Sequence, residues 1–337
     1  MTPPFVIPVF ITHQGCPHQC LFCNQHSIAG ASAVLTPEQV REAIRSQLAW
    51  PRRRPDAAVQ VAFYGGSFTG LARGRQEELL AAAQPFLASG EVREIRLSTR
   101  PDCMSPEIAQ FLYDRGVRVV ELGAQSLVDS VLAASGRGHT AAQVHEAVAS
   151  LRSAGIRVGI QLMLGLPGDT TVLAGKSARA AAGLAPDLVR IYPTLVISGS
   201  PLASLFRARA YQPLSLNRAV ALAGRLWRIF AEQGIPVVRM GLQPSRSLEE
   251  SLLAGPYHPS FGELVLSRLF FREVRALLSR RLSGQAHELV VARADESIHR
   301  GKGNCSLKRL AALGLLAGVN TIYSETQPRQ SVRLHPA

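Results

Sequence analysis

No run of about 18 apolar residues occurs in this chain of 337 residues, and its first ten residues lack both the basic segment and the apolar run of a signal peptide. The sequence therefore predicts a cytoplasmic protein with no membrane partner. Low-complexity segments are absent as well. Hydrophobic residues make up 47% of the chain and charged residues 18%, which is ample for a core and argues against a disordered chain.

Lysine is scarce, since 34 of the 37 basic residues are Arg and only Lys176, Lys302 and Lys308 are Lys. The net charge is nevertheless +13, and such a surface attracts nucleic-acid phosphates. No polybasic tail carries this charge: residues 241–337 hold 13 basic and 8 acidic side chains (net +5), and residues 1–240 hold 24 and 16 (net +8). Composition thus leaves nucleic-acid binding and a merely solvated basic surface both open.

Cysteine is also scarce, and its spacing is uneven. Three of the five cysteines, Cys16, Cys20 and Cys23, fall within eight residues with the spacing C-x3-C-x2-C, whereas Cys103 and Cys305 stand alone. Evenly spread pairs would indicate a disulfide framework, but this grouping indicates a bound metal or iron-sulfur cluster. Thiolates are the ligands of four-iron clusters, and three of them leave one iron open for chemistry.

Zinc is the competing metal, with His18 or His26 as a fourth ligand beside the three thiolates, because thiolate and imidazole suit either metal. Structural zinc loops usually come as two paired knuckles, and a second C-x2-C is absent from the sequence. The spacing therefore favours an iron-sulfur cluster and leaves zinc as the alternative.

Short β-branched or apolar runs alternate along the chain with amphipathic stretches of helical length, a pattern typical of βα units around a parallel sheet. The predicted strands are residues 7–12, 59–64, 94–99, 117–122, 158–164 and 188–192, and the predicted helices between them are 37–49, 75–87, 106–115, 141–154 and 171–184. A helix at 216–233 and a short strand at 237–240 follow. About six βα units fall short of the eight of a closed barrel.

The regular alternation fades after Gly241. A helix is predicted at 262–281 and a strand at 287–292. We therefore expect residues 1–240 to form a partial barrel and residues 241–337 to form a C-terminal α+β extension that covers the barrel mouth.

The cysteine loop resembles that of the radical S-adenosylmethionine (radical SAM) superfamily, in which C-x3-C-x2-C follows the first strand and an aromatic residue, here Phe22, precedes the third cysteine. The resemblance implies an α/β fold, the partial (β/α)6 TIM-like barrel of that superfamily. It further implies an enzyme that holds a [4Fe-4S] cluster on Cys16, Cys20 and Cys23. Such an enzyme cleaves SAM to a 5'-deoxyadenosyl radical and needs an electron donor such as flavodoxin or ferredoxin.

Further motifs of the superfamily are matched at the ends of later strands, where a parallel barrel presents its active site. Residues 63–67 resemble a Gly-Gly-Glu motif with Ser67 in place of Glu, so the contact to the SAM amino group must come from the backbone. Residues 98–102, 121–126 and 159–168 end the following strands. By this resemblance, the SAM contacts are Phe22, Gly65, Gly66, Ser98, Gln125, Arg137 and Gln161.

Over residues 5–245 the chain resembles the radical SAM half of the Elongator catalytic subunit, through residues 98–102 and 190–194, and oxygen-independent coproporphyrinogen oxidase. Residues 241–337 contain no glycine-rich turn of the kind that cradles acetyl-CoA, so acetyl transfer is not predicted. The resemblance leaves tRNA or a small molecule, such as a tetrapyrrole, as the substrate. A metal-bound nucleic-acid-binding module without SAM chemistry stays open as a third interpretation.

Substrate contacts are expected from the later strands and the C-terminal part, and the candidate catalytic residues are Tyr192, Arg239 and His258. If the substrate is tRNA, Arg190, Arg239 and the Arg-Gly-Lys segment at 300–302 are expected to line the barrel mouth.

Overall fold

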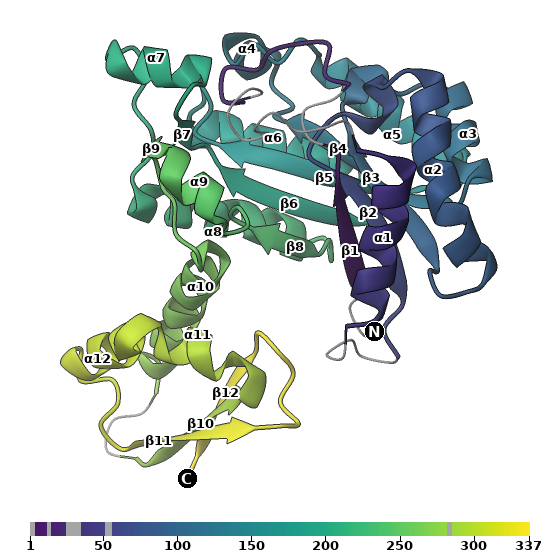
Figure 1. Ribbon diagram of the computed structural model, residues 1–337. Helices are drawn as coiled ribbons and strands as arrows, with labels where there is room; N and C mark the ends of the chain where they lie inside the picture. Colours follow the sequence, from purple (N-terminus) through teal and green to yellow (C-terminus); the bar gives the residue numbers. More distant parts are fainter. Residues whose placement is uncertain (1–3, 12–14, 25–34, 51–55, 282–284) are drawn as a thin grey trace.

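A curled sheet of seven parallel strands dominates the computed structural model, which describes residues 4–11, 15–24, 35–50, 56–281 and 285–337 (Figure 1). The strand order is β1-β2-β3-β4-β5-β6-β8, so consecutive strands are neighbours. The strands are β1 (Phe5–Phe10), β2 (Val59–Tyr64), β3 (Glu94–Thr99), β4 (Val117–Gln125), β5 (Arg157–Leu164), β6 (Leu188–Pro193) and β8 (Val237–Met240). This sheet and its helices form a half-barrel, which is the predicted partial barrel with the short strand β8 added at its edge.

The six predicted helices of this region are all present, and they cover the outer face of the sheet (Figure 1). They are α1 (Pro37–Leu48), α2 (Arg73–Ala88), α3 (Pro106–Asp114), α5 (Ala141–Ser153), α6 (Thr171–Gly183) and α8 (Leu216–Ala231), with the shorter α4 (Asp129–Ala134) and α7 (Pro201–Arg207) between them. Helix α1 begins with a capping box, in which Thr36 and Gln39 each bond the other's backbone N–H. No helix in the described part of the chain is long and apolar enough to cross a membrane.

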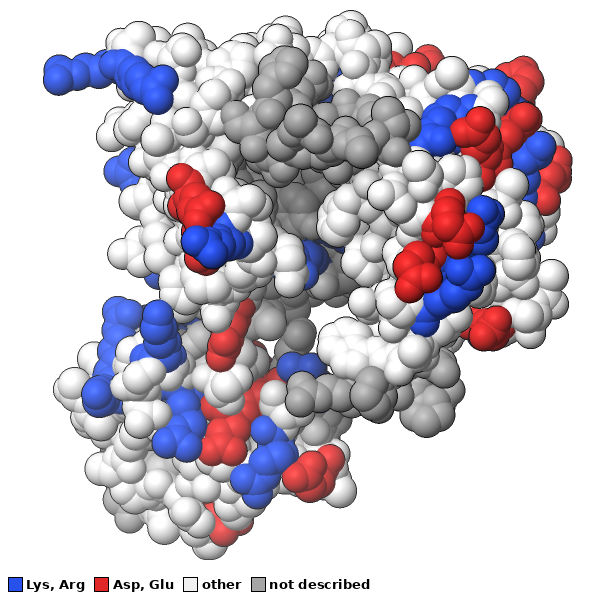
Figure 2. Space-filling view, in the orientation of Figure 1, with Lys and Arg blue, Asp and Glu red and all other residues white. Residues whose placement is uncertain are grey.

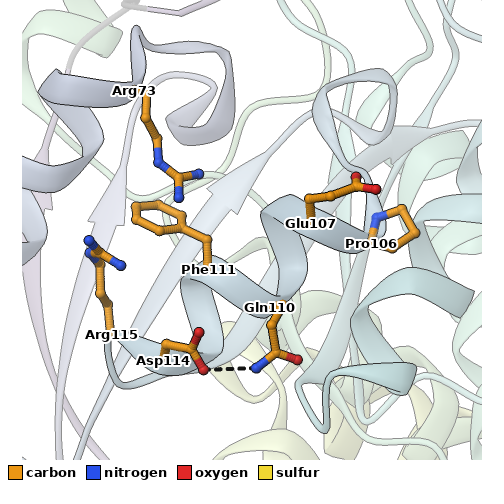
Figure 3. A pocket seen from close by; sticks show the side chains of 7 residues that line it. All are labelled: Arg73, Pro106, Glu107, Gln110, Phe111, Asp114 and Arg115. Carbon is orange, nitrogen blue, oxygen red and sulfur yellow. Dashed lines mark hydrogen bonds between the residues drawn. The ribbon is translucent and has the colours of Figure 1, made fainter.

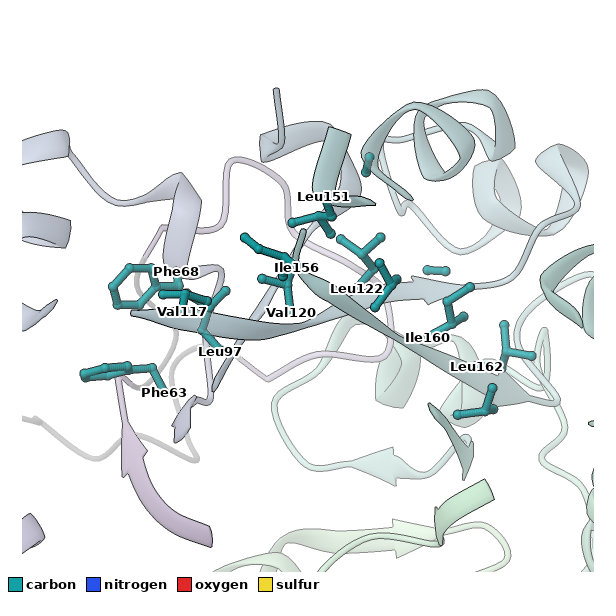
Figure 4. Packing of buried hydrophobic residues seen from close by; sticks show 14 of the residues in the cluster. Phe63, Phe68, Leu97, Val117, Val120, Leu122, Leu151, Ile156, Ile160 and Leu162 are labelled. Carbon is teal, nitrogen blue, oxygen red and sulfur yellow. The ribbon is translucent and has the colours of Figure 1, made fainter. Parts of the chain in front are cut away.

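The alternation of side chains along each strand separates an apolar outer face from a polar inner one. On β5, for example, Ile160 and Leu162 enter the core, and Gln161 between them points to the other side. Figure 4 shows Leu122 and Ile156 near Leu151 of α5, with Ile160 further along the same layer of buried side chains. Each such side chain contributes about 1.5–3 kcal/mol by burial, so the outer face holds the helices in place.

The C-terminal part forms a second, smaller sheet with its own core (Figure 1). Strand β10 (His287–Ala292) pairs in parallel with β11 (Val319–Ser324) and antiparallel with β12 (Val332–Pro336). Helices α11 (Glu296–Arg300) and α12 (Cys305–Ala312) precede β11. The predicted helix at 262–281 is α10 (Phe261–Leu278), whose first turns pack on α8 and whose last turns pack on this second core.

A short two-stranded sheet joins the two parts of the chain near the end of β6. Strand β7 (Val196–Ile197) pairs antiparallel with β9 (Leu252–Ala254), which follows α9 (Arg246–Ser251). Leu248 and Leu252 pack there on Leu195 and Ile197. Residues 245–254 therefore lie beside the segment that follows β6.

Candidate active site

The inner face of the sheet carries a network of buried charges centred on Glu121 of β4. The Glu121 carboxylate accepts hydrogen bonds from Tyr64 Oη at 2.7 Å and from Arg96 Nε, and it forms an ion pair with Arg190. Glu121 is 4% exposed and Arg96 is 5% exposed. A carboxylate in such a place must be paired, because a lone buried charge is strongly destabilising.

Two tyrosines extend this network toward the end of the sheet. Arg190 donates through Nη2 to Tyr64 Oη at 2.9 Å and through Nη1 to Tyr192 Oη at 3.1 Å. Burial and the negative charge of Glu121 raise the pKa of Tyr64, so its phenol stays protonated. The predicted substrate residue Tyr192 is thus held by Arg190 inside the half-barrel.

The cysteine loop brings its three thiols near one another. Burial raises the pKa of Cys16, and burial together with the charges of Cys20 and Cys16 raises the pKa of Cys23 to about 12. Cys20 is the most enclosed of the three, and two guanidiniums face its sulfur: Arg137 Nη1 donates to Cys20 Sγ at 3.3 Å and Arg100 Nη1 at 3.8 Å. The loop thus places positive charge beside one of three sulfurs that, as thiolates, are the ligands iron takes.

The described residues include no group of three His, Cys, Asp or Glu side chains placed to hold a single metal ion. His18, one of the two histidines considered for zinc, has Nε2 3.7 Å from Asp102 Oδ2. His26, the other, lies outside the described residues. The donor set fits a multi-iron cluster, since three soft thiolates on a short loop are the ligands that such clusters take.

Three of the predicted SAM contacts lie together around Gly123. Gln161 donates to Gln125 Oε1 at 3.1 Å. A Cβ on Gly123 would lie 3.0 Å from Gln125 Nε2 and 3.1 Å from Arg137 Nη2, so both side chains close over this glycine. Arg137 Nε is buried with no hydrogen-bond partner in the described structure, and a buried free donor of this kind fits an anionic or carbonyl group of a ligand.

Gln125 has a left-handed backbone, with φ of 65°, which is uncommon for a residue other than glycine. The register between β4 and β5 shifts at this position, so the strand bends and turns the Gln125 side chain toward Gln161. Backbone strain of this kind is concentrated at ligand sites.

The Gly-Gly-Ser segment after β2 ties the ends of two strands together. Gly65 has φ of 91°, a conformation that favours glycine. Ser67 Oγ bonds Thr99 Oγ1 at 3.0 Å and accepts from the Arg100 N–H at 3.2 Å. The Ser67 hydroxyl, at the position of the Glu in the Gly-Gly-Glu motif, is therefore used in contacts within the protein.

The remaining four predicted site residues, Phe22, Ser98, Arg239 and His258, lie at separate places. Phe22 packs on the apolar cluster that contains Leu202 of α7, and Ser98 Oγ donates weakly to the Phe63 carbonyl at 3.5 Å. Arg239 is the register partner of Arg190 and donates to the Gly241 carbonyl at 3.2 Å.

His258 lies with the C-terminal loop. Its Nδ1 accepts from the Ser260 N–H at 3.0 Å, and its Nε2 lies 3.1 Å from Lys302 Nζ. Partial burial, and then the charge of Lys302, lowers the pKa of His258. The structure thus joins Tyr192 to the Glu121 network and joins His258 to the segment at 300–302.

Sequence reasoning quoted Tyr64, Glu121, Arg100 and Asp102 within motifs but gave them no role. The sequence does contain a pattern that could have predicted this network. Each of three neighbouring strands has a polar residue among apolar ones: Gln60 in β2, Arg96 in β3 and Glu121 in β4. Polar side chains with a period of two on a buried strand must face one another or a ligand.

A surface hollow between α2 and α3 lies on the outer side of the sheet, away from these residues (Figure 3). The Arg73 guanidinium lies 3.0 Å and that of Arg115 4.1 Å from the centre of the Phe111 ring, on which both stack. Glu107, Gln110 and Asp114 add to its lining, but the hollow contains none of the predicted site residues.

Two family models match most of the chain. Residues 10–171 match the Radical SAM superfamily, and residues 186–270 match the Radical_SAM C-terminal domain. An uncharacterised protein of Methanocaldococcus jannaschii is 27% identical over 290 residues, which are 82% of this chain and 85% of that protein. The tRNA uridine(34) acetyltransferase of the same organism is 34% identical over 149 residues. That match covers 42% of this chain and only 27% of the acetyltransferase.

A solved structure has the same fold. The archaeal Elp3 of Methanocaldococcus infernus, with residues 1–46 deleted, superposes with a TM-score of 0.61 at 22% identity, covering 81% of this chain and 64% of that one. The matched segments contain the cysteine loop and every strand of the half-barrel except most of β1. The chain therefore belongs to the radical SAM superfamily of enzymes.

Proposed function

We propose that this enzyme holds a [4Fe-4S] cluster on Cys16, Cys20 and Cys23 and binds SAM beside it. The observation that carries the proposal is the enclosed Cys20 sulfur, faced by two guanidiniums and adjoining the cradle of Gln125, Arg137 and Gln161. When bound and reduced by a donor such as flavodoxin or ferredoxin, the cluster and SAM supply a 5'-deoxyadenosyl radical.

The chain's own residues would bind and orient the cofactors and keep water out. Arg137 offers a buried free Nε for the SAM carboxylate, and Gln125 and Gln161 offer amide groups for its ribose. The backbone of Gly65 and Gly66 would receive the amino group. Tyr192 and Arg239 would contact the substrate from the ends of β6 and β8, with Tyr192 oriented by Arg190. His258 would act from the C-terminal part.

Replacing Gln125 or Arg137 with Ala is expected to retain the cluster and to weaken SAM binding ten- to a hundredfold. For Arg137 the lost hydrogen bond is to a charged carboxylate and contributes about 1.5–3 kcal/mol; for Gln125 a buried polar group of the ribose would be left unpaired, which costs about 1–3 kcal/mol. About 1.4 kcal/mol is tenfold in affinity. Isothermal titration of anaerobically reconstituted protein with SAM measures the change. Gln110→Ala, on the exposed face of α3, is the matched control and should bind SAM as the parent does. Unchanged SAM affinity in both site variants would refute the assignment.

We infer that the substrate is tRNA, on which relatives named tRNA uridine(34) acetyltransferase act. Five exposed arginines on two packed helices support this: Arg225 and Arg228 on α8, and Arg268, Arg272 and Arg275 on α10. Some burial and the four neighbouring guanidiniums lower the pKa of Arg272, so the five repel one another. In the view of Figure 2, Lys and Arg side chains lie among Asp and Glu side chains on the C-terminal part of the molecule. Phosphates would relieve that repulsion.

The arginines expected at the barrel mouth have other partners. Arg190 is engaged by Glu121 and two tyrosines, and Arg300 by Glu296 and Asn304. The α8–α10 arginines are therefore the better phosphate contacts.

Bulk tRNA is expected to bind with an affinity that falls steeply between about 50 and 200 mM salt, with a log-log slope of about −0.7 to −0.9 per phosphate neutralised. The double variant Arg268→Gln/Arg272→Gln loses two phosphate contacts, so its slope should be less negative by about two such increments. The control double variant Arg41→Gln/Arg45→Gln, on α1, should keep the slope of the parent. Filter binding with heparin as competitor measures this. No binding at the lower salt, or full displacement by heparin, would leave a small molecule such as a tetrapyrrole as the better substrate.

We also propose that residues 1–240 work as the catalytic half-barrel and that residues 241–337 help to enclose its mouth. The pairing of β9 with β7, just past the end of β6, supports this proposal because it holds residues 245–254 beside that end of the sheet.

A further inference from the structure

Arg100 is among the most deeply buried charged residues of the chain, with 2% of its surface exposed. It lies directly after β3, and its side chain reaches the cysteine loop. Asp102 accepts two hydrogen bonds from it, from Nε and from Nη2, both at 2.9 Å. Such a two-point pair fixes the plane of the guanidinium.

Each guanidinium nitrogen of Arg100 has at least one partner. Nη2 donates to the Arg137 carbonyl at 2.6 Å, and Nη1 points at Cys20 Sγ, 3.8 Å away. The backbone of Arg100 is anchored by its N–H bond to Ser67 Oγ. Arg100 therefore has no free nitrogen for SAM or substrate, unlike Arg137 with its unpartnered Nε.

The charge of Arg100 is permanent, because a guanidinium is not deprotonated in proteins. Asp102 binds the Nε and Nη2 side of the guanidinium, and Nη1 points toward Cys20 Sγ. The positive group therefore lies between the sulfur and the carboxylate. Reduction adds one negative charge to a cluster and its ligands, and the external donor loses one electron. A fixed positive charge beside one ligand stabilises that added charge, more so in a buried place.

We propose that Arg100, oriented by Asp102, is a positioning residue that raises the reduction potential of the cluster through Cys20. The inference rests on the cluster proposed above. In this proposal Arg100 and Asp102 do not bind SAM. They make the cluster easier to reduce by a weakly reducing electron donor before SAM is cleaved.

The test is a redox titration of the anaerobically reconstituted protein without SAM, followed by electron paramagnetic resonance. Arg100→Met should reduce the equilibrium constant for cluster reduction tenfold or more, and tenfold is a midpoint about 59 mV lower for one electron. Arg100→Lys keeps the charge and should shift the midpoint less. Asp102→Asn removes a negative charge and should raise the midpoint. Arg73→Met, on the outer side of α2, should leave it unchanged.

A midpoint in Arg100→Met that is equal to or above that of the parent overturns the inference, and so does a shift of Asp102→Asn in the same direction as Arg100→Met. If Arg100→Met fails to hold the cluster, Asp102→Asn decides alone: a raised midpoint supports the inference, and an unchanged or lowered one overturns it. Failure of the parent protein to take up a cluster would instead refute the proposed function.

Discussion

Alanine in place of Cys16, Cys20 or Cys23 is expected to abolish both the iron-sulfur cluster and the cleavage of SAM. In the proposed site each of the three would supply one ligand to a four-iron cluster that has no fourth protein ligand, so only two thiolates would remain. Anaerobic reconstitution with iron and sulfide, followed by absorption near 400 nm and iron analysis, measures the cluster. Release of 5'-deoxyadenosine after addition of dithionite and SAM measures the cleavage.

Cys103 and Cys305 are the matched controls, and their alanine variants should retain the cluster. Cys103 is a demanding control because it lies near Arg100 and Arg137, the two arginines that face Cys20. Burial raises the pKa of its thiol, and the charges of both arginines act on it. It is therefore close to the site without being part of the C-x3-C-x2-C loop. Loss of the cluster in Cys103→Ala would contradict the three-ligand assignment. Stoichiometric zinc and no iron, in protein never exposed to air, would favour the metal-bound nucleic-acid-binding module.

Replacing Glu121 with Leu is expected to destabilise the fold by about 3–5 kcal/mol, the effect of breaking a buried ion pair by removing one partner. The substitution would leave the guanidiniums of Arg96 and Arg190 buried without a carboxylate and would remove the acceptor of the Tyr64 hydroxyl proton. Since domains are stable by only about 5–15 kcal/mol in total, the urea midpoint of unfolding should fall markedly.

Glu121→Gln separates the effect of charge from that of shape. It should be less harmful than Glu121→Leu, because its amide oxygen can still accept from Tyr64 or Arg96. Glu38→Gln, which removes an exposed partner of Arg41 and Arg45, is the surface control and should leave the midpoint unchanged. A Glu121→Leu protein as stable as the parent would show that the network is not needed to hold the half-barrel together.

The order of elements was predictable from the sequence, because it depends on neighbours along the chain. Buried apolar residues recur every two positions along β5 and about every 3.6 positions along α8, and this spacing predicts the strand and the helix. The Thr36–Gln39 capping box predicts where α1 begins. Helix α10 and strand β10 were predicted for the same reason. The cysteine spacing was equally local, since all three ligands lie on one short loop.

What the sequence determined by itself is therefore the set of βα units, the cysteine loop and, through them, membership of the radical SAM superfamily. Only the tertiary structure decided which polar side chains meet. Tyr64, Glu121 and Arg190 come from β2, β4 and β6, and Arg100 reaches Cys20 across 80 positions of the chain. Such contacts depend on strand register and on the curl of the sheet, which are set by packing of the whole core and leave no pattern between neighbouring residues.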